Sequence, residues 1–211
     1  VADAVVPINE GFRSEFYTPK QADGSEVIYL CGNSLGLQPK GVRAAIEQEL
    51  LDWEKLGVEG HFEAKNPWFN YHEPLLENAA VVVGAQPVEV ALMNSLTTNL
   101  HLLMVSFYRP TAKRYKILIE GSAFPSDRYA VASQAQFHGY DPADAILEAK
   151  PRPGEDCLRQ DDIEALIKRE GDSIALILFG GVNYYTGQAF DMQAITQAGH
   201  DAGCTVGFDL A

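Results

Sequence analysis

The chain has 211 residues, of which 46% are hydrophobic and 21% are charged, a balance typical of a globular protein rather than a disordered one. Its formal net charge of −13 argues against nucleic-acid binding and against contact with an anionic membrane surface, because both need a basic patch. No stretch approaches the roughly 20 apolar residues of a membrane span. A small anionic ligand remains compatible with this charge if its site is locally positive.

The three cysteines, Cys31, Cys157 and Cys204, are odd in number and widely spaced. This pattern favours reduced thiols in a cytoplasmic protein over a disulfide framework or a zinc site. The histidines lack the spacing of metal ligands, so we expect no bound metal. The segment Val1–Glu10 contains acidic but no basic residues, which is not typical of a signal peptide.

The first part of the chain predicts two helices. Apolar residues recur at three-to-four spacing between about Pro39 and Leu56, and Pro39 suits a first helical turn. A second helix is expected over Glu73–Val83, ended by Gly84. We therefore expect residues 1–70 to form an N-terminal arm with a leading helix, and residues 71–211 to belong to a large α/β domain.

Strands and helices are predicted to alternate through the rest of the chain. The run Ile174–Leu178 is continuously apolar, as in a strand buried on both faces of a parallel sheet. The alternation predicts an α/β fold with a mostly parallel sheet and helices on both faces. Strands are expected at Val88–Met93, Lys116–Ile119, Ala145–Ala149, Ser173–Phe179 and Thr205–Phe208, and helices at Leu96–Tyr108, Ser126–Gln136, Asp161–Arg169 and Met192–Ala202.

Ligands in such folds bind at the carboxyl ends of the strands, so the segments after each predicted strand are candidates. The hydroxyl residues of Met93–Thr98 stand at a helix start, where free N–H groups suit a phosphate, although Ser95 or Thr97 can equally serve only as a helix cap. In the next such segment, Phe124 is placed to stack on a flat ring. A helix begun by Pro125 is the alternative reading of that segment.

Two further segments are candidates. Gly180 and Gly181 allow a ligand to approach the backbone closely, and the polar and aromatic residues Asn183–Tyr185 that follow could line a pocket or form a wide turn with core tyrosines. His61 could contact a ligand or be an ordinary surface histidine.

Asp209 ends the last predicted strand, where a buried carboxylate is costly unless it has a partner. A protonated pyridine nitrogen is one suitable partner, because the carboxylate keeps the nitrogen charged and makes the ring a strong electron sink. A metal ion, a loop cap and a nucleotide ribose are the alternatives.

Taken in order, these segments resemble the kynureninase family, which are fold-type-I enzymes that depend on pyridoxal 5'-phosphate (PLP). The resemblance runs from about residue 28 to residue 211. Cysteine desulfurases and aminotransferases share the fold but are not expected to carry these strings. The strings are Leu30–Pro39 (LCGNSLGLQP), Met93–Thr97 (MNSLT), Asn99–His101 (NLH), Lys113–Ile117 (KRYKI), Phe124–Asp127 (FPSD), Tyr185–Gln188 (YTGQ) and Gly207–Ala211 (GFDLA).

The resemblance implies a role for several residues. Leu96 and Thr97 would bind the phosphate, Phe124 would stack on the pyridine ring, and Asp209 would pair with the ring nitrogen. Ser34 and His61 would contact the substrate. The full set of implied cofactor contacts is Leu96, Thr97, Phe124, Pro125, Ser126, Asp127, Gly180 and Asp209; some relatives carry serine at the position of Gly180.

The resemblance also implies an activity, which is hydrolysis of L-kynurenine, and also of its 3-hydroxy form, to the corresponding anthranilate and L-alanine. Such an enzyme would be a cytoplasmic homodimer of tryptophan catabolism or NAD biosynthesis. In the family a histidine, the Schiff-base lysine and a small C-terminal domain follow the segment Phe208–Ala211, so we expect the catalytic lysine to lie outside this chain. The alternatives are another fold-type-I PLP enzyme, such as a cysteine desulfurase or aminotransferase, and a non-catalytic binding module.

Overall fold

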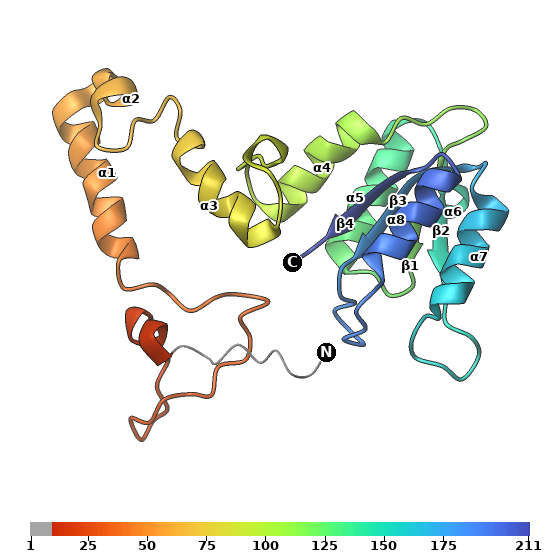
Figure 1. Ribbon diagram of the computed structural model, residues 1–211, viewed down its shortest axis with the longest axis horizontal. Coiled ribbons are helices and arrows are strands. Elements are labelled where there is room, and N and C mark those ends of the chain that lie inside the picture. Colours follow the sequence, from red (N-terminus) through yellow and green to blue (C-terminus); the bar gives the residue numbers. More distant parts are fainter. Residues whose placement is uncertain (1–9) are drawn as a thin grey trace. The chain divides into compact units, whose positions relative to one another are not determined.

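The computed structural model describes residues 10–211, so the expectation for Val1–Glu10 lies almost wholly outside the described residues. The chain forms two compact units, Val1–Leu92 and Met93–Ala211 (Figure 1). The expected domain boundary near residue 70 remains a prediction for the whole protein; helix α3 (Glu73–Val83) belongs here to the first unit.

The first unit confirms both predicted helices. Helix α1 begins at Val42 rather than Pro39, because residues 39–41 form a turn before it. Gly57 and Gly84 follow α1 and α3 with φ angles of 53° and 70°, which glycine adopts most readily. The helices of this unit are η1 (Glu10–Glu15), α1 (Val42–Leu56), η2 (Gly57–Glu59), α2 (Gly60–Glu63), α3 (Glu73–Val83) and η3 (Pro87–Glu89).

The predicted strand Val88–Met93 is wrong. Pro87–Glu89 forms the 3-10 helix η3, and residues 90–93 pair with no strand. The helix is favoured because Glu89 accepts a hydrogen bond from the backbone N–H of Gln86 at 2.8 Å, as part of a capping box. Val88 is 92% exposed, so its apolar side chain marks no buried strand.

The second unit is the predicted α/β fold. Its four strands all pair in parallel, in the order β2-β1-β3-β4. The predicted strand at 145–149 is one residue shorter, because Asp141 caps a single helical turn that ends at Ala145. The elements are α4 (Leu96–Phe107), β1 (Lys116–Glu120), α5 (Pro125–Phe137), α6 (Pro142–Ala145), β2 (Ile146–Ala149), α7 (Gln160–Glu170), β3 (Ile174–Gly180), α8 (Met192–Asp201) and β4 (Thr205–Asp209).

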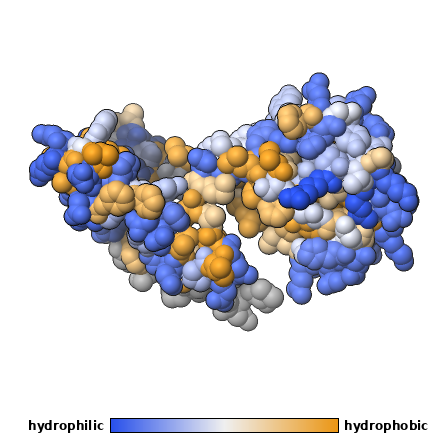
Figure 2. Space-filling view, turned by 90° about the horizontal axis from the view of Figure 1, so that it is seen from above, coloured by the Kyte–Doolittle hydropathy of each residue, from blue (hydrophilic) through white to orange (hydrophobic). Residues whose placement is uncertain are grey.

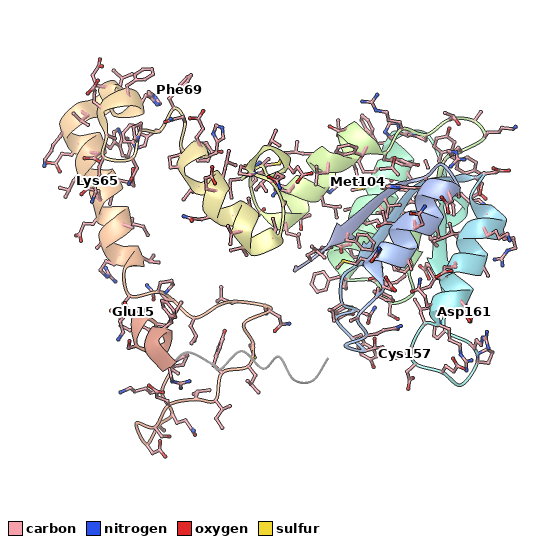
Figure 3. The ribbon with its side chains drawn as sticks, viewed as in Figure 1. Glu15, Lys65, Phe69, Met104, Cys157 and Asp161 are labelled. Carbon is pink, nitrogen blue, oxygen red and sulfur yellow. The ribbon has the colours of Figure 1, made fainter. Side chains whose placement is uncertain are left out.

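Helices cover both faces of this sheet, as predicted. Side chains alternate along a strand between the two faces, so Ile117 and Leu118 of β1 enter different clusters. Ile117 packs with Met104 of α4 (Figure 3) and with α5, whereas Leu118 packs with Ile167 of α7 and with α8 (Figure 1). The six residues Ile174–Phe179 are all buried, which confirms β3 as a central strand.

The surface carries hydrophobic areas among hydrophilic ones (Figure 2). Exposed apolar side chains include Val81 and Val82 of α3 and Leu103 and Phe107 of α4. Within residues 10–211, no helix is both long enough and apolar enough to cross a membrane.

Candidate active site at the carboxyl ends of the strands

The two central strands of the sheet separate at their carboxyl ends. Pairing between β1 and β3 ends at Leu118 and Ile177, although β1 continues beside β2 to Glu120 and β3 continues beside β4 to Gly180. The chain leaves β1 toward β2 on one side and leaves β3 toward β4 on the other. This is the topological switch point at which open α/β sheets bind ligands.

Three carboxyl groups meet at this point. Glu120, the last residue of β1, is only 4% exposed, and both of its oxygens accept the backbone N–H of Gly180 at 3.2 Å. Asp127, in the first turn of α5, is 7% exposed and lies within hydrogen-bonding reach of Asp209 at the end of β4. Sequence reasoning proposed both aspartates and missed Glu120. The signal was present, because Glu120 is also a charged residue that ends an apolar strand.

The proximity of these groups perturbs their protonation. Burial, followed by the hydrogen bond and charge of Asp209, raises the pKa of Asp127 to about 7. The hydroxyl of Ser126, 3.3 Å from Asp127 Oδ1, opposes this rise, and the charge of Glu120 adds to it. Burial is also the main cause that raises the pKa of Glu120, with Asp209 contributing.

The carboxyl cluster therefore favours a cationic ligand. Among the ion pairs of the described residues, none involves Glu120, Asp127 or Asp209. A cation placed between these groups would lower the cost of their ionisation. A protonated ring nitrogen satisfies this requirement with one charge and one N–H donor.

An aromatic surface lies next to the cluster. Phe124 directly precedes α5, which begins with Pro125, and its ring packs edge-on against Tyr184 with centroids 5.2 Å apart at 88°. Phe124 is 46% exposed, so part of its ring remains open to a ligand. The segment starts a helix, as the alternative reading predicted, and stacking of Phe124 on a ring remains a prediction.

The start of helix α4 remains open. Ser95 precedes the helix but makes no side-chain hydrogen bond to its backbone; its hydroxyl instead lies 3.3 Å from that of Thr98. Leu96 and Thr97 are exposed. The N–H groups of the first turn are therefore left for water or an anion, which leaves the predicted phosphate role of Leu96 and Thr97 a prediction.

The loop after β3 is organised by Asn183. This side chain is 4% exposed; its oxygen accepts the N–H groups of Tyr185 at 3.1 Å and Thr186 at 3.0 Å, and its amide donates to the carbonyl of Ser122 at 3.3 Å. Ser122 has a φ of 57°, the one positive value at a non-glycine position among the described residues. Asn183 thus joins the loops after β1 and β3. The alternative with core tyrosines is wrong, since Tyr184 and Tyr185 are 55% and 78% exposed.

A cavity of about 690 Å³ adjoins these loops. Its lining includes Ser122, Cys157, Asn183 and Gln188, and Cys157 lies in the loop before α7 (Figure 3). Neither Phe124 nor Asp209 is part of the lining. The candidate site is therefore defined by the carboxyl cluster, where the chemical groups converge, rather than by this cavity.

The predicted substrate residues lie in the first unit. Ser34 is exposed and its N–H donates to the carbonyl of Cys31 at 3.0 Å. His61 is exposed on α2, with its ring edge-on to Trp68 at 5.6 Å. Trp68 is itself held by a 2.8 Å hydrogen bond from its indole N–H to Glu49. The substrate roles of Ser34 and His61 remain predictions.

The lysines of the KRYKI segment lie at the amino ends of the strands. Lys116 is the first residue of β1, and its amino group is 3.5 Å from Glu170. The opposite edge carries the carboxyl cluster, so neither Lys113 nor Lys116 is placed to react there. In the part of the chain that the structure describes, no group of three His, Cys, Asp or Glu side chains is arranged to hold a metal.

Comparison with known proteins gives close relatives in one family. The chain is 64% identical to the kynureninase of Koribacter versatilis over 209 residues, which are 99% of this chain and 49% of that protein. It is 59% identical to the kynureninase of Myxococcus xanthus over 201 residues, covering 95% and 47% of the two chains. The mouse kynureninase is 52% identical over 211 residues, covering 95% and 46%. No protein-family model matches the chain.

Solved structures agree on the fold. A cysteine desulfurase from Thermococcus onnurineus superposes with a TM-score of 0.69 at 18% identity, covering 96% of this chain and 47% of that one. A C-DES mutant with glycine covalently linked to the PLP cofactor gives a TM-score of 0.60 at 14% identity, covering 94% and 46%. The chain spans about half the length of the curated relatives it matches. By sequence, it is a relative of the kynureninases over nearly its whole length.

Proposed function

We propose that this chain is part of a PLP-dependent kynureninase, which hydrolyses the bond between Cβ and Cγ of L-kynurenine to give anthranilate and L-alanine. The observation that carries the proposal is the Asp127–Asp209 pair at the switch point of the sheet, beside the exposed ring of Phe124. The identity of 52–64% to kynureninases supports the choice of reaction.

The described residues fit the cofactor. The carboxyl pair lacks a cation, Phe124 presents a ring face, and the start of α4 has free N–H groups for a phosphate. The residues that would hold PLP are Leu96, Thr97, Phe124, Pro125, Ser126, Asp127, Gly180 and Asp209. When bound, PLP supplies an electron sink that stabilises negative charge next to the amino group of the substrate.

The role of the protein is to place charge and to orient groups. Asp209 would accept the hydrogen bond of the protonated ring nitrogen, and Asp127 would place a second carboxyl group beside it. Phe124 would fix the plane of the ring. The hydroxyl of Ser126 would keep the carboxylate of Asp127 oriented toward Asp209.

The proposal includes the substrate contacts, the assembly and the location. Ser34 and His61 would contact the aromatic end of kynurenine or 3-hydroxykynurenine. A homodimer and a cytoplasmic location are implied by the resemblance. Sedimentation of the purified full-length protein tests the dimer.

The test uses the protein made from its complete reading frame. Incubation with L-kynurenine should release fluorescent anthranilate, whereas incubation with L-cysteine should release no sulfide. Asp209→Asn should lower kcat/KM by at least a hundredfold and change the absorbance spectrum of bound PLP. Asp201→Asn changes an exposed aspartate of α8 and should leave both unchanged.

Sulfide without anthranilate would replace this proposal with a cysteine desulfurase. A reading frame that supplies no lysine after Ala211, together with a protein that binds no PLP, would favour a non-catalytic binding module.

A further inference from the structure

On the side that faces β1, the end of β3 is held by a side chain instead of a neighbouring strand. The N–H of Gly181 donates to the carbonyl of Asp209 on the β4 side at 2.7 Å. The N–H of Gly180 points to the other side, where pairing with β1 has already ended. Glu120 accepts it with both carboxylate oxygens at 3.2 Å. A carboxylate thus takes the place of a main-chain carbonyl.

Close packing fixes this arrangement. A Cβ atom on Gly180 would lie 3.2 Å from Oε1 of Glu120 and 3.2 Å from the carbonyl oxygen of Val182. Glu120 is 4% exposed, and burying a carboxylate is costly. A strand end could be held by main-chain pairing at no such cost, so a charged residue here calls for a further role.

Glu120 acts electrostatically on the candidate site. The charge of Asp209 from β4 raises the pKa of Glu120, and the charge of Glu120 in turn raises the pKa of Asp127 from α5. Negative charge on Glu120 therefore strengthens the negative potential at the pair that would face the ring nitrogen. In a site shielded from water, one added charge changes the affinity for a cation severalfold.

We propose that Glu120 is a positioning residue of the cofactor site: it ties the end of β3 to the end of β1 through the N–H of Gly180, and its charge makes the Asp127–Asp209 pair prefer a protonated ring nitrogen. This inference rests on the proposed PLP site. Glu120 need not touch the cofactor itself.

The test is Glu120→Gln in the full-length protein. Glutamine keeps the size and one oxygen that accepts the Gly180 N–H, but it removes the charge. We expect a melting temperature close to that of the wild type, a dissociation constant for PLP about tenfold higher, and a midpoint for the pH titration of the bound-PLP absorbance shifted to lower pH. The matched control is Glu148→Gln, which changes a glutamate of β2 that pairs instead with Arg128.

Glu120→Asp separates the effect of the charge from the effect of side-chain length. It keeps the charge, so its pH midpoint should remain close to that of the wild type even if shortening the side chain weakens the contact with Gly180. The inference is overturned if Glu120→Gln matches Glu148→Gln in PLP affinity and pH midpoint, or if Glu120→Asp shifts the midpoint as Glu120→Gln does. If Glu120→Gln does not fold, Glu120→Ala, which also removes the charge, replaces it in the same two measurements.

Asp209→Asn distinguishes the two levels of the proposal. If Asp209→Asn leaves PLP binding and absorbance unchanged, the proposed cofactor site fails. If Asp209→Asn alters them and Glu120→Gln does not, only the role of Glu120 fails.

Discussion

Asp127 and Asp209 bring their carboxyl groups together from the first turn of α5 and the last residue of β4. They are 82 positions apart in the sequence, and only the parallel sheet makes them neighbours. Burial of Asp127 and the neighbouring charge of Asp209 raise the pKa of Asp127 and favour a proton on it in the cofactor-free protein. The pair is thus ready for a ligand that carries one positive charge.

The pKa of Asp127 predicts a pH dependence of stability. Because folding raises this pKa from 3.8 to about 7, the folded state holds a proton that the unfolded state releases, and stability falls as pH rises between those values. Asp127→Asn should remove this loss. The free energy of unfolding of the variant relative to the wild type should therefore be on the order of 2 kcal/mol higher at pH 8 than at pH 5. Urea denaturation of the cofactor-free proteins at both pH values measures it. An equal change in the two proteins would contradict the prediction.

The exposed ring of Phe124 is expected to contribute to the affinity for PLP. Phe124→Leu keeps an apolar side chain but removes the flat ring, so PLP should dissociate about fivefold more readily, corresponding to about 1 kcal/mol of lost stacking. Fluorescence titration of the cofactor-free protein measures the affinity. Phe137→Leu is the control, since Phe137 lies at the other end of the same helix and is 80% exposed. Equal affinities for the two variants would exclude stacking on Phe124.

The hydrogen bonds of Asn183 predict that this residue stabilises the loops of the candidate site. Asn183→Ala leaves the N–H groups of Tyr185 and Thr186 and the carbonyl of Ser122 without this partner. The free energy of unfolding should fall by about 2 kcal/mol, as measured by urea denaturation. Tyr185→Ala changes an exposed side chain of the same loop and should cost less than about 0.5 kcal/mol. The prediction fails if both variants unfold at the same urea concentration.

The hydrogen bonds of Arg114 predict that this residue stabilises the folded protein at a distance from the candidate site. Its guanidinium donates to the carbonyls of Ile174 at 2.8 Å, Ala202 at 3.0 Å and Gly203 at 3.0 Å, which joins the start of β3 to the turn before β4. Arg114→Ala should lower the free energy of unfolding by about 2 kcal/mol without changing PLP affinity. Arg169→Ala removes an exposed ion pair and should cost less than about 1 kcal/mol. A large loss of PLP affinity in Arg114→Ala would show that the two edges of the sheet are coupled.

The packing of Trp68 against Gly60 in the first unit leaves no room for a larger residue at position 60. A Cβ atom at this position would overlap Cη2 of Trp68, so Gly60→Ala must displace the indole and weaken its hydrogen bond to Glu49. We expect a red shift of tryptophan fluorescence and a loss of about 2 kcal/mol. Gly41→Ala, with nothing within 4 Å of the added atom, should change neither. An unshifted spectrum for Gly60→Ala would contradict the described packing.

The sequence determined the strands of the second unit, its helices except the single turn α6, and the order of its candidate segments. Apolar runs such as Ile174–Leu178 and glycine stops such as Gly84 are local signals, so strands and helices followed from them. The same local reasoning was wrong for Val88–Met93, because a capping box around Pro87 outweighed an apolar stretch that has no partner strand. It identified Asp209 as a carboxylate in need of a partner.

Tertiary structure decided which groups meet. Strand order, the separation of β1 from β3 after Leu118 and Ile177, and the contact of Glu120 with Gly180 depend on pairing between segments distant in the sequence. No periodicity encodes such pairing, because it arises from the packing of whole elements around a shared core. The sequence therefore specified the chemical groups, and the sheet brought three carboxyl groups near one another, where the burial of Glu120 and Asp127 and mutual repulsion create the demand for a cation.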